Sequence, residues 1–196
     1  MARIIAVVGD PNSGKSVFLR LLYDELAKRN VKVLSQEADI FAPTQGWSLS
    51  PNGSHIRKEL KRSFEFEKRL KWILKSLEGL RSNFDGIVLA DVGGGRPDLG
   101  IRVTDENKEI LSRCTHVIIV SRDEESINAW KKELAEKVPH VKVLIALRSI
   151  YNPEGKYNFD EKGVIWHLDR TAYFNKLIPE PTLKLISNLV DEVILG

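Results

Sequence analysis

The segment Gly9–Ser16, which reads GDPNSGKS, constrains the fold of this chain more than any other feature. It places glycine, Gly-Lys and serine at the fixed positions of the phosphate-binding pattern G-x-x-x-x-G-K-[ST]. That pattern is specific where it follows a buried strand and opens a helix. Residues 3–8 (RIIAVV) are the short apolar run of a strand covered on both faces, and residues 16–29 have helical spacing of apolar side chains. The context therefore predicts a strand–loop–helix anion site rather than an ordinary glycine-rich turn.

Each residue type in this loop has a physical reason. Glycines let the backbone wrap closely around an anion with its N–H groups inward, and the helix N-terminus adds partial positive charge. We expect Lys15 to stabilise the phosphoryl group as a catalytic point charge and the Ser16 hydroxyl to ligate Mg²⁺. The residues predicted to bind the nucleotide are Gly9, Asp10, Pro11, Asn12, Ser13, Gly14, Lys15, Ser16 and Val17.

Asp91, near the end of the apolar segment 84–92, is the second candidate metal residue. A carboxylate at this place in P-loop NTPases holds Mg²⁺, here through water. The glycines at 93–95 allow the backbone to approach a γ-phosphate. The alternative is an aspartate that caps a turn. Arg96, which follows the glycines, either contacts phosphate or is an exposed loop residue.

Strand-like and helical segments alternate along the chain, which indicates a parallel sheet with helices on both faces. We predict an α/β three-layer P-loop NTPase fold with a mostly parallel five-stranded sheet in the kinase–GTPase-like order 2-3-1-4-5. No repeat or linker divides it, so residues 1–196 are expected to form a single P-loop nucleotide-binding domain. The expected strands are 3–8, 31–35, 84–92, 115–120 and 141–147, with 163–168 as a candidate sixth; the expected helices are 16–29, 55–82, 104–112, 124–137 and 181–195.

The sequence favours ATP over GTP. Guanine-specific GTPases carry Asn-Lys-x-Asp after a late strand. The two Asn-Lys pairs of this chain, at 107–108 and 175–176, lack the aspartate, and neither follows an expected strand. We therefore expect ATP and Mg²⁺ as the cofactors.

Two acidic residues after the second strand are candidate catalytic groups beside Lys15. Glu37 and Asp39 lie two residues apart, so they share one face of an extended segment. A carboxylate here can accept the proton of an acceptor hydroxyl in a P-loop kinase, with Asp39 slightly favoured. The alternative is a cap or a solvated loop acid.

Other segments leave the partner open. The loop 41–54 is long, which is usual for functional loops. Arg57, Lys58, Lys61 and Arg62, within the basic helix 57–75, either grip a phosphorylated substrate, nucleic acid or acidic protein, or form a solvated face. No motif supports nucleic acid. In the late segment 163–170, Trp166 and Arg170 are candidates to contact the nucleotide, and the alternative for Trp166 is packing in the core. Arg122, just after the fourth strand, faces either the nucleotide or solvent.

Four segments together resemble one group of P-loop proteins: PNSGKSVF (11–18), DVGGG (91–95), THVIIVSRDEESINAW (115–130) and GVIWHLDR (163–170). They resemble the kinase-like or ATPase-like P-loop domain fused to, or encoded beside, the small ring nuclease of type III CRISPR systems, which degrades cyclic oligoadenylate. The resemblance implies that Lys15, Ser16 and Asp91 bind nucleotide and magnesium. It also implies a CRISPR ring nuclease as partner, but no nuclease activity of this chain.

Composition and charge narrow the function classes further. The chain has 196 residues, is 42% hydrophobic and carries a net charge of +3, as an ordinary globular domain does. It shows no membrane-spanning run and no signal-peptide pattern, so we expect a cytoplasmic protein with no membrane partner. The lone Cys114 excludes an internal disulfide and is expected to be buried.

Two functions are therefore expected. The first is an ATP-dependent phosphotransferase or ATPase that acts on an acceptor of unknown class. The second is a nucleotide-dependent regulatory module with little or no turnover.

Overall fold

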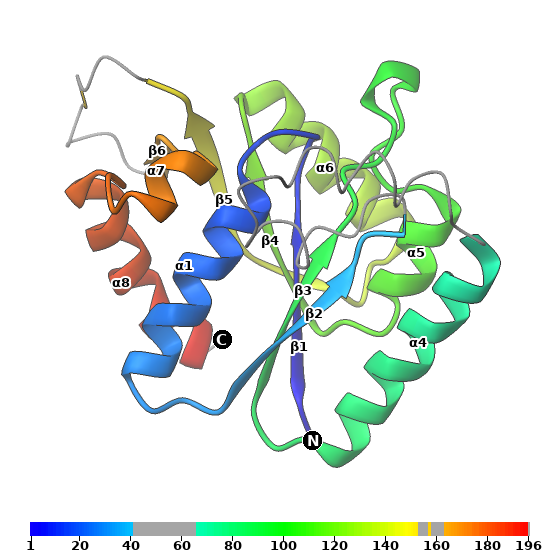
Figure 1. Ribbon diagram of the computed structural model, residues 1–196. Coiled ribbons are helices and arrows are strands. Elements are labelled where there is room, and N and C mark those ends of the chain that lie inside the picture. The colour runs from blue at the N-terminus through cyan, green and yellow to red at the C-terminus, as the bar shows by residue number, and fades with distance from the viewer. Residues whose placement is uncertain (41–65, 153–156, 158–162, 196) are drawn as a thin grey trace.

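The computed structural model describes residues 1–40, 66–152, 157 and 163–195. Their central feature is a parallel six-stranded sheet in the order β2-β3-β1-β4-β5-β6 (Figure 1). The strands are β1 Arg3–Val8, β2 Val33–Ala38, β3 Ile87–Val92, β4 His116–Ser121, β5 Lys142–Ile150 and β6 Val164–Trp166. The predicted order of five strands is confirmed. The candidate sixth strand at 163–168 is also present as β6, which pairs with β5 at the edge, so the sheet has six strands and not five.

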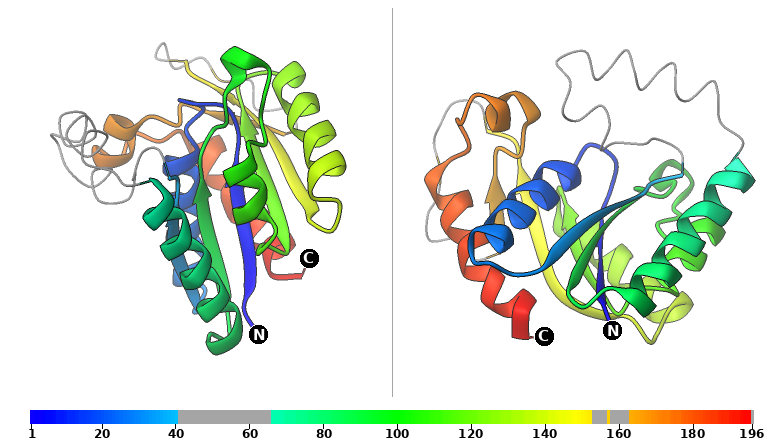
Figure 2. Two further views of the ribbon diagram at one scale, coloured as in Figure 1. Left: turned by 90° about the vertical axis from the view of Figure 1, so that its right-hand side faces the viewer. Right: turned by 60° about the horizontal axis from the view of Figure 1, so that its bottom comes forward.

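Helices cover both faces of the sheet and complete three layers (Figures 1 and 2). Helices α1 (Lys15–Lys28) and α8 (Glu180–Leu195) pack on one face, where their apolar side chains meet alternate residues of the strands. Helices α4 (Phe66–Asn83), α5 (Asp105–Leu111) and α6 (Glu124–Lys137) cover the other face and enclose a second core. The strands β1, β3 and β4 are therefore buried on both faces, as their apolar runs predict, whereas β2 and β5 also carry exposed residues.

Element boundaries differ from expectation in places that matter for the site. The second strand is β2, at 33–38 rather than 31–35, so Glu37 lies inside the sheet. The helix expected at 55–82 is described from Phe66 onward as α4, and its earlier part lies outside the described residues. The five-residue helix α7 (Arg170–Phe174) and the 3-10 turn η1 (Pro97–Leu99) were not predicted, because such short elements carry no periodic pattern.

The carboxyl ends of the strands meet at one edge of the sheet, and the loops that follow β1, β3, β4 and β6 gather there (Figure 1). In open parallel α/β sheets, ligands bind at this edge. Within the described residues, no helix has the length and apolar character needed to cross a bilayer.

Candidate functional site

The phosphate loop joins β1 to α1, as the sequence predicts. Gly9 has φ 145° and Gly14 has φ 84°, backbone conformations that side chains rarely adopt. A Cβ added at Gly9 would lie 1.7 Å from the Val120 carbonyl oxygen, and one at Gly14 would lie 2.4 Å from Leu168 Cβ. Both glycines are therefore required by backbone conformation and by close approach of the chain.

The end of β4 holds this loop in place. The Ser13 hydroxyl donates to the Val120 carbonyl at 2.6 Å, and the Asp10 amide donates to the Ser121 hydroxyl at 3.2 Å. Ser13 is buried, so its side chain anchors the loop instead of facing a ligand. The Lys15 ammonium donates to the Asp10 carbonyl at 2.8 Å and thus lies across the loop. Val17 packs, partly buried, against the core beneath α1.

The two candidate metal residues are in direct contact. The Ser16 hydroxyl donates to Asp91 Oδ2 at 2.7 Å, and Asp91 is 3% exposed. This contact arises because α1 lies on the sheet face to which Val7 and its in-register partner Asp91 direct their side chains. A hydroxyl and a carboxylate oxygen at this distance form a donor set that suits Mg²⁺.

The two candidate catalytic carboxylates lie at the same edge of the sheet. Glu37 is paired in register with Asp91, so both side chains project from the same sheet face. Asp39 follows the strand, and its Oδ1 lies 3.1 Å from the position of a Cβ on Gly93. The Asp39 carbonyl accepts a hydrogen bond from Arg69 Nε at 3.2 Å, which ties this segment to α4. The structure thus brings Glu37 and Asp39 beside Asp91 and the glycines.

The loop after β3 packs directly against the phosphate loop. A Cβ on Gly94 would lie 2.8 Å from the Pro11 ring, so the two loops touch there. Asn107, buried on α5, donates through Nδ2 to the Gly93 carbonyl at 3.1 Å. It was not predicted as part of the site, because nothing in the sequence distinguishes it from an ordinary helix residue.

Arg96 is an exposed loop residue, the second of the two expected alternatives. Its guanidinium pairs with the Asp98 carboxylate at 3.1 Å on the turn η1. The hydrogen bond between them raises the pKa of Arg96 and lowers that of Asp98. Asp98 therefore balances the charge of Arg96.

Asp10 makes side-chain contacts that the sequence did not predict. Its Oδ1 accepts a hydrogen bond from Trp130 Nε1 at 2.9 Å and lies 3.3 Å from Arg102 Nε. Trp130 belongs to the apolar stripe of α6, and Arg102 lies in a turn-rich segment, so neither carries a local signal. The Asp10 carboxylate therefore faces the protein, and only its backbone belongs to the loop's inner surface.

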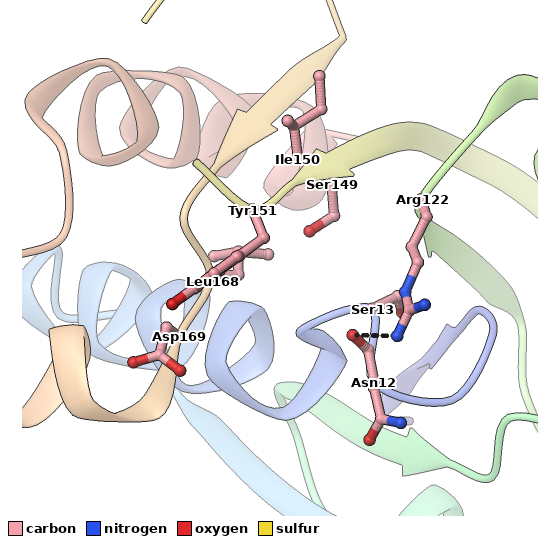
Figure 3. A pocket seen from close by; sticks show the side chains of 8 residues that line it. All are labelled: Asn12, Ser13, Arg122, Ser149, Ile150, Tyr151, Leu168 and Asp169. Atoms are coloured by element: carbon pink, nitrogen blue, oxygen red, sulfur yellow. Dashed lines mark hydrogen bonds between the residues drawn. The ribbon is translucent and has the colours of Figure 1, made fainter. Parts of the chain in front are cut away.

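A cavity of about 530 Å³ opens beside the phosphate loop, between the ends of β4, β5 and β6 (Figure 3). Arg122 lies at its edge, where Nη2 of its guanidinium donates to the Asn12 carbonyl at 3.4 Å. Asp169 lies in its wall and caps α7 by accepting from the Ala172 amide at 3.1 Å. The cavity is lined by Asn12, Ser13, Arg122, Ser149, Ile150, Tyr151, Leu168 and Asp169.

The late segment divides between cavity and core. Trp166 is 8% exposed, and its backbone exchanges hydrogen bonds with the Thr182 hydroxyl on α8. Trp166 therefore packs in the core, which is one of the two roles expected for it. Arg170 begins α7 and does not line the cavity.

Some predicted residues lie outside the described part of the chain. These are the loop 41–54 and the basic residues Arg57, Lys58, Lys61 and Arg62. In the part that the structure does describe, His, Cys, Asp and Glu side chains form no cluster suited to a metal ion. The Ser16–Asp91 pair is thus the candidate metal site there.

The fold matches those of several solved structures. The septum site-determining protein MinD from Pyrococcus horikoshii, solved in complex with Mg-ADP, has a TM-score of 0.68 and 16% identity over 98% of this chain and 96% of that chain. pNOB8 ParA bound to nonspecific DNA has a TM-score of 0.60 and 13% identity over 99% and 98%. Cobyrinic acid a,c-diamide synthase from Mycobacterium smegmatis, with bound ADP and magnesium, has a TM-score of 0.57 and 14% identity over 99% and 94%.

Comparison of the sequence with protein-family models and with curated proteins found no match. The structural likeness, at these identities, establishes the three-layer P-loop NTPase fold.

Proposed function

We propose that this protein binds Mg·ATP at the phosphate loop and acts as an ATPase or an ATP-dependent phosphotransferase. The observation that carries the proposal is the 2.7 Å contact between Ser16 Oγ and Asp91 Oδ2, directly after Lys15, whose ammonium donates to the Asp10 carbonyl of the same loop. These groups come from the helix α1 and the strand β3, and they would supply both metal ligands and a phosphate-binding cation. A glycine-rich turn that binds no ligand does not require these groups to lie close together.

The residues have separate roles at this site. Lys15, which lies across the loop, would move onto the β- and γ-phosphates and stabilise their negative charge. Ser16 and Asp91 would hold the magnesium ion, which when bound neutralises charge on the phosphate oxygens. The N-terminus of α1 points its amides toward the same place.

The cavity beside the loop supports a base and ribose site. Its volume of about 530 Å³ lies within the range of small-molecule pockets, and Asn12 connects it to the phosphate loop. Adenine is favoured because the chain lacks the guanine-specific Asn-Lys-x-Asp sequence. The similar structures of MinD and cobyrinic acid a,c-diamide synthase contain ADP, with magnesium in both.

Binding is tested by titrating the protein with Mg·ATP in a calorimeter. We expect saturable binding by the wild type and a loss of at least about tenfold in affinity for Lys15→Ala, because a charge-assisted contact is removed. Lys28→Ala is the matched control, since Lys28 is an exposed lysine at the other end of α1 that pairs with Glu25. A wild type with no affinity for Mg·ATP would overturn the proposal.

The placement of Glu37 and Asp39 beside Asp91 supports transfer to an acceptor or activation of water. Either carboxylate would orient the attacking group and accept its proton. Phosphate release and ADP formation are measured for Asp39→Asn, Glu37→Gln and the double variant. We expect lower turnover with nearly unchanged Mg·ATP affinity; a double variant as active as the wild type would contradict this role.

A regulatory module is the alternative. In that case Mg·ATP would bind without turnover, and residues 41–54 or 57–75 would contact a partner. Association with a type III CRISPR ring nuclease stays a prediction from sequence resemblance. Co-purification of the two proteins, with and without Mg·ATP, is its test.

A further inference from the structure

Asp10 places a carboxylate within the phosphate loop, four residues before Gly14. Its side chain is 15% exposed, as is that of Arg102, and Trp130 beside it is fully buried. A negative charge at this place opposes the binding of a polyphosphate, because charges interact more strongly where little water separates them. The loop therefore needs a group that offsets Asp10.

Arg102 is that group, and its backbone is held in place from several directions. The Arg102 and Val103 amides donate to the Glu133 carboxylate on α6 at 2.7 and 3.0 Å. The Arg102 carbonyl lies against Gly95, where a Cβ would come within 2.3 Å of it. These contacts fix the backbone from which the Arg102 side chain extends. Only the side chain itself must then be ordered to place the guanidinium near Asp10.

The contact between the two side chains is mainly one of charge. Arg102 Nε lies 3.3 Å from Asp10 Oδ1, but the geometry falls short of an aligned hydrogen bond. The hydrogen bond to Asp10 comes instead from Trp130 Nε1 at 2.9 Å. Trp130 thus sets the orientation of the carboxylate, and Arg102 compensates its charge.

We propose that Arg102 is a positioning residue for nucleotide binding. It neutralises Asp10 and, together with Trp130, holds that carboxylate on the α6 side of the loop. The phosphates then meet the charge of Lys15 without opposition from Asp10. This inference rests on the proposed function, because it assigns a role at the same phosphate site.

A double-mutant cycle in Mg·ATP affinity tests the proposal. Arg102→Ala leaves the Asp10 charge uncompensated and should raise Kd about tenfold, the effect expected when a buried charge loses its partner. Asp10→Asn should change Kd by less than about threefold, because it removes the charge that Arg102 offsets. The double variant should return to within about threefold of Asp10→Asn. Arg113→Ala, which removes an arginine–glutamate pair with Glu78, is the control and should leave Kd unchanged.

The double variant separates the proposed role from a merely structural one. If Arg102 only shaped the loop after β3, the double variant would bind as weakly as Arg102→Ala, and that result would overturn the proposal. An unchanged Kd for Arg102→Ala would do the same.

A wild type that binds no Mg·ATP would overturn the proposed function but not yet this inference. The same variants are then titrated with inorganic pyrophosphate, which probes the anion site alone. The same pattern of loss and rescue is expected there; its absence, or no pyrophosphate binding by the wild type, would overturn the inference.

Discussion

At the scale of single residues, the phosphate loop depends on positions where only glycine fits. Gly9 and Gly14 both have left-handed or related backbone angles, and both lie against neighbouring chain segments. The sequence pattern predicts these glycines, and the structure shows the atoms that exclude a Cβ. Gly79 on α4 is a contrasting case, since a Cβ there would have nothing within 4 Å.

Gly9→Ala and Gly79→Ala should therefore have opposite effects. Gly9→Ala should lower the free energy of unfolding by more than about 2 kcal/mol, because backbone strain and a clash with Val120 act together. Gly79→Ala, exposed within a helix, should raise it by up to about 1 kcal/mol. Urea denaturation of both variants measures the difference. Equal effects of the same sign would contradict this account of Gly9.

Cys114 is buried, as the sequence predicts, and its thiol should be unreactive. Burial raises the pKa of the thiol to about 12, only partly opposed by Arg81, so little thiolate exists near neutral pH. We expect a chromogenic disulfide reagent to label Cys114 only when the protein is unfolded in urea. Rapid labelling of the native protein at neutral pH would show that the site opens.

At the scale of elements, α6 supports the loop that follows β3. Glu133 accepts the amides of Arg102 and Val103, and Lys137 donates to Glu133 at 2.7 Å and to the Val103 carbonyl at 2.6 Å. The side chains of one helix thus fix the backbone of a loop about 30 residues earlier in the chain. No local pattern predicts this pairing.

This support should depend on pH. Although burial alone would raise the pKa of Glu133, Lys137 and the two amides together lower it below its usual 4.5. A carboxyl whose pKa is lower in the folded than in the unfolded protein stabilises the fold at pH values above its unfolded-state pKa. This contribution is lost as the pH falls through its folded-state pKa. Glu133→Gln should therefore destabilise by about 1–3 kcal/mol at neutral pH and by less near pH 3.

Urea denaturation at neutral pH and near pH 3 measures the free energy of unfolding of the variant and of the wild type. The difference between the two proteins is then compared at the two pH values. Glu136→Gln, an exposed neighbour on α6, is the control. A penalty for Glu133→Gln that stayed the same at both pH values would show that its charge has no such role.

At the scale of the whole molecule, the phosphate loop is where separate parts of the fold meet. It contacts β4 through Val120 and Ser121, the loop after β3 through Pro11, and α6 through Asp10. A nucleotide bound there would contact several of these parts at once. Its binding should then stabilise the entire domain and not one loop.

Mg·ATP should therefore raise the melting temperature of the wild type. At a ligand concentration about 100 times Kd, binding adds about 2.7 kcal/mol. For a chain of this length, that corresponds to roughly 5–10 °C. At the same ligand concentration Lys15→Ala, with its affinity lower by at least about tenfold, should lose about half of the shift or more, whereas Lys28→Ala should keep it, as differential scanning fluorimetry can show. A shift of equal size in Lys15→Ala would place the binding site elsewhere.

The sequence by itself determined the phosphate loop, the order of five strands and the choice of Ser16 and Asp91 as candidate metal residues. These follow from local spacing and from the rules that govern parallel sheets, which act on short segments and their sequence. Only the tertiary structure decided the pairing of β6 with β5, the cavity at the ends of β4 to β6, the contact of Ser16 with Asp91, and the contacts of Asp10 with Arg102 and Trp130. Asp10 and Trp130 are 120 positions apart in the chain. Such contacts depend on how finished elements pack, and no periodicity along the chain records that packing.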